Sequence, residues 1–404
     1  MRFLLGKPNE LSLALEPKNK WYTWESIFWL DPGGASPVSE VLTTNHSSSP
    51  AAMLKLLLIF VPAAILLSFL SPLSHMLIFL AACLAIVPLA GLLGRATEEL
   101  THNTSEGIGG LLNATFGNAT ELIIAVAALQ KGLYQVVKAS VTGSLIGNLL
   151  LVLGGAILAG GIKHERQRFN VIAARAQVTL LTLATIGMIM PAAFHYLAGP
   201  GGRSKENDLS LAISLVLLLA YAAHLVFSLR THKQLFAGIP AEADTAAWSM
   251  KKSILILLGA TVLIAWVSEI LVGSVEEAAA TLGLTRVFIG VIVVAVVGNA
   301  AEHSTAVMMA IKNRMELSIG IATGSSLQIA LFVAPVLVAV SHFIGPRPMD
   351  LVFTPAEVLA IFLAVLISGQ ITSDGESNWL EGALLLAVYL ILAIMFFFLP
   401  EAVS

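Results

Sequence analysis

Long apolar runs, separated by short polar or glycine-containing breaks, dominate the sequence from Met53 onward. Each run approaches the roughly 20 residues that a helix needs to cross a bilayer. The runs lack the alternation of polar and apolar residues that membrane-barrel strands require. The pattern predicts an all-α integral membrane protein with about eleven transmembrane helices, at 54–70, 76–94, 108–130, 136–161, 171–197, 209–230, 253–272, 287–311, 317–343, 354–371 and 379–398.

Composition agrees with this pattern and excludes other classes of protein. Hydrophobic residues make up 57% of the 404 positions and charged residues 12%, whereas soluble domains carry about 25% charged residues. A net charge of -3 without a long basic block argues against nucleic-acid binding. Cys83, the single cysteine, lies in an apolar run and can form neither an intramolecular disulfide nor a cysteine zinc cluster.

The charges also predict an orientation. Residues 1–50 are mixed polar and have the character of a tail, with no secretory signal. If the chain crosses the membrane at each predicted span, most of the 22 lysines and arginines fall on the side of this tail. The positive-inside rule then places the N-terminus in the cytoplasm of a multi-pass protein. A prokaryotic plasma membrane or a vacuolar membrane suits this orientation, and the sequence also allows a homo-oligomer.

An internal repeat appears when the sequence is compared with itself at an offset of 181 residues. The shared residues include Asn, Glu, Lys and Thr-Gly-Ser, which apolar composition does not favour by chance. The matches are Gly117-Asn-Ala-Thr-Glu121 with Gly298-Asn-Ala-Ala-Glu302, Lys131 with Lys312, and Thr142-Gly-Ser144 with Thr323-Gly-Ser325.

The repeat predicts how the chain is organised. Each unit holds five spans, and because five is odd, the second unit must enter the membrane from the opposite side. The expected architecture is an inverted five-plus-five helix repeat with one extra N-terminal helix. The expected parts are a polar tail at 1–50, the extra helix and its turn at 51–75, the first repeat at 76–230, a linker at 231–252 and the inverted repeat at 253–400.

Two acidic residues are the strongest functional candidates. Glu121 and Glu302 lie inside predicted spans with no lysine or arginine beside them, and a carboxylate in hydrocarbon is costly unless it serves a function. Asn118 and Asn299, three residues earlier, project from the same helical faces. Two carboxylates and two amide oxygens that converge from inverted helices would suit a hard metal cation.

Several neighbours extend this candidate site. Gly117 and Gly298 would let the helices approach closely or break, which exposes backbone carbonyls as ligands. Ser144 and Ser325 lie in the following spans, and Gln328 is a further polar group there. Packing of small residues is the alternative interpretation for the glycines and serines, but it explains no buried charge.

Histidine and acidic groups nearby leave two interpretations open. His303 follows Glu302, but one residue turns a helix by about 100°, so it cannot share the direction of that glutamate. It is a proton-relay candidate beside Glu121 and Glu302, or a packing histidine. Glu98 and Glu99, at the cytoplasmic end of the second span, form either an ion-attracting vestibule or a solvated helix end.

At these residues the chain resembles the calcium/cation antiporter superfamily, and within it the calcium/proton exchanger (CAX) family. The resemblance covers roughly residues 75 to 400. It rests on the segments Arg95-Ala-Thr-Glu-Glu-Leu100, Gly117-Asn-Ala-Thr-Glu-Leu-Ile123, Gly143-Ser-Leu-Ile-Gly-Asn-Leu-Leu-Leu-Val-Leu-Gly154, Gly298-Asn-Ala-Ala-Glu-His303 and Gly324-Ser-Ser-Leu-Gln-Ile-Ala-Leu-Phe332.

The resemblance implies a ten-helix inverted-repeat core with an extra N-terminal helix. It implies that Glu121 and Glu302 bind calcium and exchange it for protons, with Asn118, Asn299 and Gln328 as helpers. The acidic linker that is long in some family members is reduced here to Glu242 and Asp244, which argues against calcium buffering by the linker.

Two carboxylates that face one site can be neutralised by one divalent cation or by two protons, and burial and mutual repulsion favour protonation of an empty pair. The expected function is therefore secondary active exchange of Ca2+ for H+, with no cofactor and no enzymatic activity. A sodium-coupled or broader divalent cation exchanger is the alternative, followed by a passive channel. An intramembrane metalloenzyme is disfavoured because the sequence has no His-Glu-x-x-His cluster.

Overall fold

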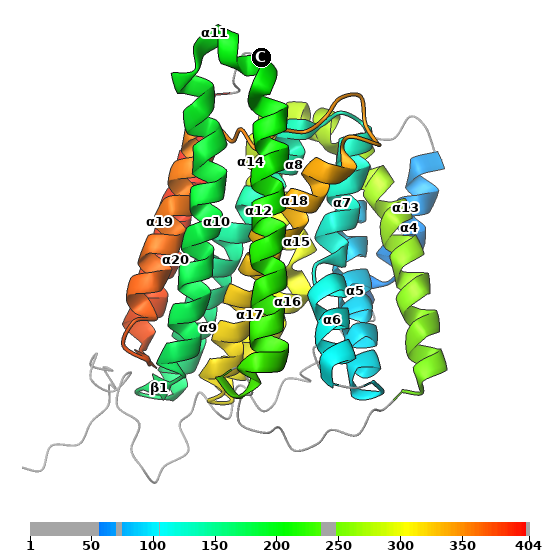
Figure 1. The fold of residues 1–404 in the computed structure, drawn as a ribbon. Helices are drawn as coiled ribbons and strands as arrows, with labels where there is room; N and C mark the ends of the chain where they lie inside the picture. The colour runs from blue at the N-terminus through cyan, green and yellow to red at the C-terminus, as the bar shows by residue number, and fades with distance from the viewer. Residues whose placement is uncertain (1–55, 70–74, 105, 236–247, 401–404) are drawn as a thin grey trace, which may run out of the picture. The chain divides into compact units, whose positions relative to one another are not determined.

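A computed structural model describes residues 56–69, 75–104, 106–235 and 248–400, and this part of the chain folds almost entirely into helices (Figure 1). The predicted tail at 1–50 lies outside the described residues, as does most of the predicted linker. The described segments of the linker are 231–235 and 248–252.

The first half of the described chain runs from α4 to η4. Its elements are α4 (Phe60–Phe69), α5 (His75–His102), α6 (Glu106–Phe116), α7 (Ala119–Gln130), α8 (Tyr134–Ile146), the π-helix η1 (Gly147–Val152), α9 (Leu153–Lys163), the strand β1 (Gln167–Arg168), α10 (Val171–Leu197), α11 (Gly199–Gly202), the 3-10 helix η2 (Arg203–Lys205), α12 (Glu206–Val226), the π-helix η3 (Phe227–Thr231) and the 3-10 helix η4 (Lys233–Leu235).

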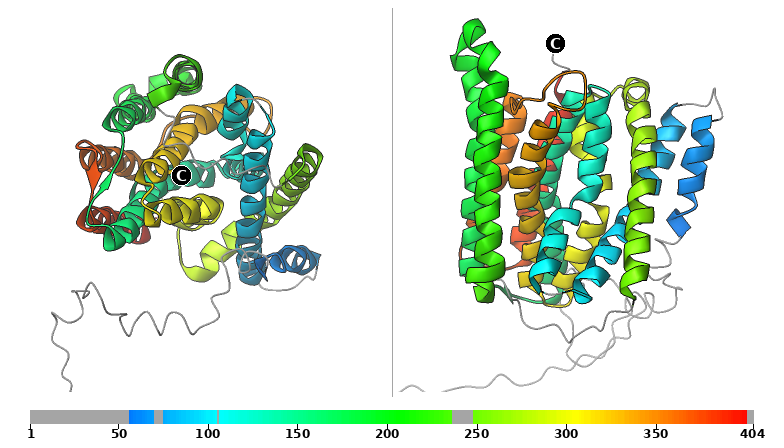
Figure 2. Two further views of the ribbon diagram at one scale, coloured as in Figure 1. Left: turned by 90° about the horizontal axis from the view of Figure 1, so that it is seen from below. Right: turned by 45° about the vertical axis from the view of Figure 1, so that its right-hand side comes forward.

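The second half runs from α13 to α20. Its elements are α13 (Met250–Leu282), α14 (Arg286–Phe288), the π-helix η5 (Ile289–Val294), α15 (Ala295–Gly298), α16 (Ala300–Ile311), α17 (Met315–Gln328), the π-helix η6 (Ile329–Val333), α18 (Ala334–Val340), α19 (Pro355–Ile371), the strand β2 (Glu376–Ser377) and α20 (Trp379–Phe398). In both views of Figure 2, the green helices α10 and α12 lie at one side of the bundle and the blue helix α4 at the other. The most buried of the candidate spans are 134–163 and 315–340.

The chain is a multi-pass membrane protein. Within the described residues, seven continuous helices are long and apolar enough to cross a membrane, and the bent pair at 286–311 raises the number to as many as eight. The other predicted spans correspond to the shorter apolar helices α4, α7 and α19. The total of eleven spans therefore stays a prediction.

Most predicted boundaries lie close to the observed ones, and α10 and α20 have the predicted bounds. The exceptions are α5 and α13, which continue past the predicted ends at 94 and 272 to His102 and Leu282. The additional turns carry the exposed residues Glu98, Glu276 and Glu277. These charges end the apolar pattern, but they do not end the helix, because a helix can continue beyond the hydrocarbon layer.

The two halves share local structure at the predicted offset. The helices α7 and α16 each have 12 residues and begin at Ala119 and Ala300. Both are followed by a turn with positive φ, 74° at Gly132 and 59° at Asn313. The next helices, α8 and α17, both continue into π-helices. These parallels support the inverted repeat, which remains a proposal.

A short two-stranded sheet joins loops of the two halves at the lower end of Figure 1. Gln167 pairs with Ser377 and Arg168 pairs with Glu376, in antiparallel order. The Arg168 guanidinium also donates to the Glu376 carboxylate at 3.0 Å. Gln167 donates to the carbonyl of Ala310 at 2.8 Å, so this loop also holds the end of α16.

Candidate ion-binding site

Two helices are interrupted at the repeated Gly-Asn pairs. In the first half α6 ends and α7 begins with Asn118 as its N-cap. In the second half α15 ends at Gly298, and the chain bends by 60° before α16 continues from Asn299. The glycines also permit close contacts: a Cβ on Gly117 would lie 2.6 Å from the Asn113 carbonyl oxygen. The breaks expected from the sequence are therefore present.

Each break places a glutamate in the first turn of the helix that follows. Glu121 on α7 is buried, and Glu302 on α16 is half-buried. The Glu121 side chain packs against Gly298 of the other half, where an added Cβ would lie 3.6 Å from its Cγ and 3.9 Å from its Oε1. The two carboxyl groups lie close enough to interact electrostatically. The structure thus brings the repeated acids together.

The amides and hydroxyls of the two halves are hydrogen-bonded to one another. Asn118 donates to Gln328 Oε1 and accepts from Ser325 Oγ at 3.0 Å. Asn299 Nδ2 donates to Ser144 Oγ, also at 3.0 Å. Each asparagine therefore contacts the serine of the opposite repeat. Six predicted side chains, those of Asn118, Asn299, Gln328, Ser144, Ser325 and Glu302, belong to these contacts, because Glu302 also contacts Ser325.

Three buried oxygens at this site have no hydrogen-bond donor among the described residues. They are Asn148 Oδ1, Asn299 Oδ1 and Glu302 Oε2. Asn148 is held in place by donating to Ser325 Oγ at 3.0 Å. Buried acceptors without partners are uncommon and costly. Carboxylate and amide oxygens are the ligands that hard cations prefer, so this donor set fits a metal ion.

Two groups that were candidates for ion or proton handling stand apart from these contacts. His303 is half-buried, and within the described residues its side chain is not part of the hydrogen-bonded set. Glu99 is buried and accepts the backbone N–H of Trp248 at 3.0 Å. Glu99 therefore anchors the end of the linker to α5, whereas Glu98 is exposed.

Sequence analysis missed two polar side chains that flank the site, those of Glu357 and Gln177. Thr142 on α8 donates to Glu357 Oε1 on α19 at 3.3 Å, and Thr323 on α17 donates to Gln177 Oε1 on α10 at 2.6 Å. The two contacts are counterparts, because the threonines are repeat mates. A signal was available: Glu357 is an acid within the predicted span 354–371.

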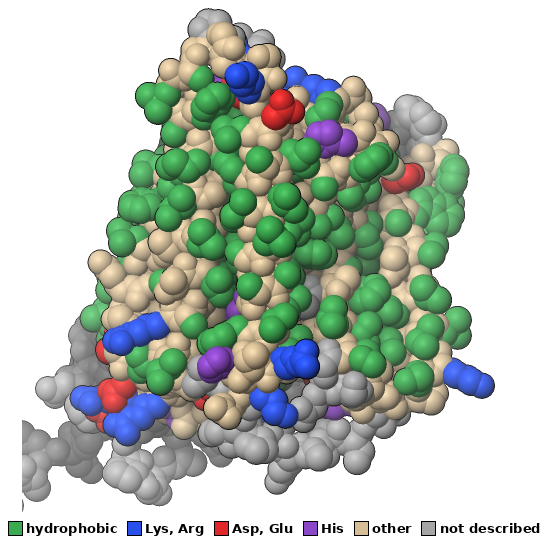
Figure 3. Space-filling model, viewed as in Figure 1, with side chains coloured by type: hydrophobic (Ala, Val, Ile, Leu, Met, Phe, Trp, Pro, Cys, Tyr) green, Lys and Arg blue, Asp and Glu red, His purple; other side chains and the backbone are tan. Residues whose placement is uncertain are grey.

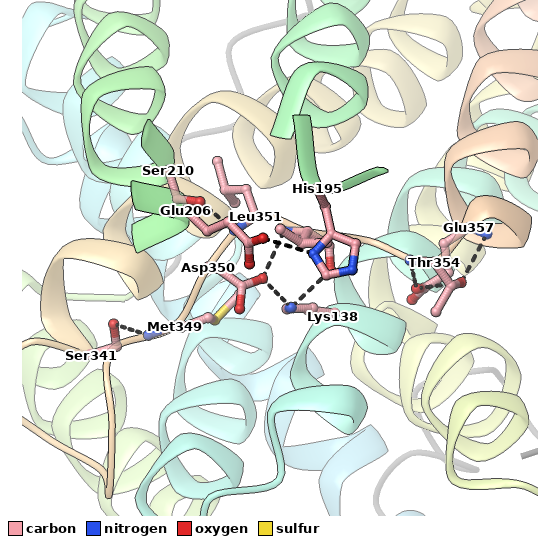
Figure 4. A network of polar contacts seen from close by, with 11 residues as sticks. Lys138, His195, Glu206, Ser210, Ser341, Met349, Asp350, Leu351, Thr354 and Glu357 are labelled. Carbon is pink, nitrogen blue, oxygen red and sulfur yellow. Dashed lines mark hydrogen bonds and ion pairs between the residues drawn. The ribbon is translucent and has the colours of Figure 1, made fainter. Parts of the chain in front are cut away.

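Further polar contacts fasten the loop between α18 and α19 over one end of the bundle (Figure 4). Lys138 on α8 forms an ion pair with Asp350 of this loop and donates to the Val352 carbonyl at 2.8 Å. Ser210 on α12 accepts the backbone N–H of Leu351 at 2.9 Å. The loop thereby ties α8 to helices of both halves.

The two ends of the site are covered unequally. A Cβ on Gly143 of α8 would lie 2.0 Å from the Val291 carbonyl oxygen of η5, whereas a Cβ on its repeat mate Gly324 would meet no atom within 4 Å. Exposure differs in the same way. Asn113 on α6 is exposed, and its repeat mate Val294 is 2% exposed. The helix α8 is therefore closed onto η5, and α17 is not closed in the same way onto α6.

Comparison with known proteins identifies the family. Residues 74–230 and 252–398 match the sodium/calcium exchanger protein family. A Ca(2+)/H(+) antiporter of Aphanothece halophytica is 46% identical over 359 residues, covering 85% of this chain and 96% of the relative. The Ca(2+)/H(+) antiporter ChaA of Bacillus subtilis is 47% identical over 355 residues, covering 86% of this chain and 100% of the relative.

A solved structure agrees with these relatives. The structure of native YfkE superposes with a TM-score of 0.75 at 44% sequence identity, and the match covers 86% of this chain and 100% of that chain. The family match spans both halves of the described bundle, including both Gly-Asn breaks and both glutamates. This chain therefore belongs to the sodium/calcium exchanger protein family.

Proposed function

We propose that the chain exchanges Ca2+ for H+ across a membrane as a secondary active antiporter. The observation that carries this proposal is the meeting of Glu121 and Glu302 from two broken helices, beside buried oxygens that have no donor in the part of the chain that the structure describes. The antiporter names of relatives at 46% and 47% identity support the choice of ions.

The geometry suggests a role for each group. Glu121 and Glu302 supply the negative charge that one Ca2+ or two protons neutralise, so the two kinds of ion compete for one site. The unpartnered oxygens of Asn299 and Glu302 are direct ligand candidates, and Asn148 joins them. Ser144, Ser325 and Gln328 orient the asparagines through the contacts described above, while Gly117 gives the room that the first break needs and Gly298 lies against the Glu121 side chain.

Competition becomes exchange if the site opens to one side at a time and changes side only when its charge is neutralised. The unequal packing of α8 on η5 and of α17 on α6 is what such a mechanism requires. On the visible face in Figure 3, lysines and arginines gather mainly at the lower end. The positive-inside rule makes that end cytoplasmic, so the less covered side of the site faces the cytoplasm.

The first test is to neutralise each glutamate separately. We expect Glu121→Gln or Glu302→Gln to reduce Ca2+ uptake to the level of empty liposomes when a pH gradient drives it, because one carboxylate cannot balance a divalent ion. The matched control is Glu277→Gln, at an exposed position of α13. Its uptake should equal that of the unmodified protein, and unmodified flux in either site variant would refute the proposal.

The second test separates the possible coupling ions. With the same proteoliposomes, uptake should stop when an ionophore collapses the pH gradient and should not respond to an imposed sodium gradient. Uptake that follows the sodium gradient would favour the sodium-coupled alternative. Calcium flux that follows only its own gradient, and drives no counter-movement of protons, would indicate a channel.

A further inference from the structure

A lysine at the end of α7 docks on another helix. Lys131 is the C-cap of α7, and its Nζ donates to the backbone carbonyl of Glu269 on α13 at 3.3 Å. The ammonium group lies beside Gly273, where a Cβ would be 2.8 Å from Nζ. A glycine at this position therefore leaves the space that the lysine occupies.

The second half contains the same parts in a different arrangement. Lys312, the repeat mate of Lys131, is the C-cap of α16. The helix α5 carries a glycine in a similar place: Gly94 lies eight residues before the end of α5 at His102, and Gly273 lies nine residues before the end of α13 at Leu282, although the two glycines are not repeat mates at the offset of 181 residues. The helices also pair equivalently, since α7 packs on α13 and α16 packs on α5.

The second lysine and glycine do not meet in this structure. A Cβ on Gly94 would meet no atom within 4 Å, and Gly94 is exposed. Within the described residues, the Lys312 side chain has no hydrogen bond or ion pair. One lysine is thus docked at the end where α8 is closed onto η5, and its mate is free at the other end, where Gly324 is uncovered.

We propose that Lys131 and Lys312 are alternating latches of the exchange cycle. In this structure Lys131 docks beside Gly273 and stabilises closure of the end where α8 packs on η5. When the other end closes, Lys312 docks beside Gly94. The inference rests on the alternating access of the proposed function. Both lysines are positioning residues: they fix the ends of α7 and α16, the helices that carry Glu121 and Glu302.

The physical basis is a state-dependent hydrogen bond. A lysine ammonium at a helix end can reach along an apolar helix to a backbone carbonyl, provided that no side chain blocks it. Because each contact forms in one state, it stabilises that state and not the other. Removing a latch must therefore move the population away from the state in which the latch is closed.

The test measures the accessibility of two matched cysteines in the full-length Cys83→Ala protein in liposomes. Asn113→Cys reports on the end that is open here and Val294→Cys on the closed end, each labelled with a membrane-impermeant maleimide. Lys131→Met should raise the labelling rate of Val294→Cys roughly three- to tenfold, the population change expected from one net hydrogen bond. Lys312→Met should lower that rate.

Two further variants remove docking without touching the lysines. Gly273→Leu should act like Lys131→Met, and Gly94→Leu should act like Lys312→Met, because each leucine fills the space that a lysine needs. Lys131→Arg should shift the labelling less than Lys131→Met, since it keeps the charge.

Opposite shifts for the two lysine variants support the latches, whereas equal shifts or no shift would overturn them. Labelling requires no transport, so the two proposals can fail separately. If the two lysine variants shift the labelling in opposite directions but the protein shows no proton-driven Ca2+ uptake, only the proposal of Ca2+/H+ exchange is refuted. If proton-driven uptake is present but the lysine variants leave the labelling unchanged, only the proposal that Lys131 and Lys312 act as latches is refuted.

Discussion

At the scale of single residues, repetition was the signal that separated the two candidate ion-binding acids from a third buried acid with a structural role. Glu121 and Glu302 were found because each lies in a Gly-Asn-Ala-x-Glu segment. Glu357 lies in a predicted span too, but it has no acidic repeat mate. Its carboxylate accepts the backbone N–H of Thr354 at 2.9 Å and the Thr354 hydroxyl at 2.8 Å, so it caps α19.

Removing that cap should affect stability and spare transport. Thr354→Ala should destabilise the folded protein by about 1 kcal/mol, the usual contribution of an N-cap side chain. The measurement is the thermal unfolding midpoint in detergent, with Ca2+ uptake recorded in parallel. Thr179→Ala is the control, since the Thr179 hydroxyl only donates to the Arg175 carbonyl within α10. An unchanged midpoint for Thr354→Ala would show that the capping box contributes little.

At the scale of helices and loops, hydropathy predicted where the apolar helices lie but not how their backbones are wound. The bounds of α10 and α20 and the breaks near Gly117 and Gly298 agree with expectation. The π-helical segments η1, η5 and η6 were not anticipated, because a change from i→i+4 to i→i+5 hydrogen bonding leaves no trace in an apolar pattern. Hydropathy also did not predict which helices α5 and α8 contact, because those contacts depend on tertiary packing.

The close approach of α8 to η5 makes one glycine much less replaceable than its repeat mate. Gly143→Ala should destabilise the protein by about 1–3 kcal/mol, the usual effect of overpacking, because the new methyl group would overlap the Val291 carbonyl. Gly324→Ala meets no atom and should leave the unfolding midpoint in detergent unchanged. Equal midpoints for the two variants would contradict the unequal closure of the two ends.

At the scale of the whole molecule, sequence reasoning predicted two related halves but not the difference between them. The motifs are nearly the same in both, so they give no reason why Gly143 should be covered and Gly324 uncovered. Under the proposed function, that difference marks one of the two conformations that exchange would require. Residues that the two halves share therefore indicate where the candidate site lies. Repeat mates that are packed differently indicate which end of the site is closed in this structure.

The orientation of the molecule can be tested along α12 and its flanking turns. Arg203 precedes this helix and Lys233 follows it, so the two exposed residues lie at opposite ends of the bundle. In a Cys83→Ala background expressed in a bacterial plasma membrane, Arg203→Cys should react with an impermeant maleimide in intact cells. Lys233→Cys should react only after permeabilisation, because the positive-inside rule places it in the cytoplasm. The reverse labelling pattern would invert the proposed orientation.

The small sheet between β1 and β2 has a consequence for biosynthesis. Gln167 and Arg168 are made early, but their partners Glu376 and Ser377 leave the ribosome more than two hundred residues later. During that interval the strand β1, in the loop after α9, has no partner strand to pair with. A chain truncated before residue 376 would keep every helix of the first half and still lack the pairing of β1 with β2. The loop after α9 therefore reaches its final structure only when the second half is nearly complete.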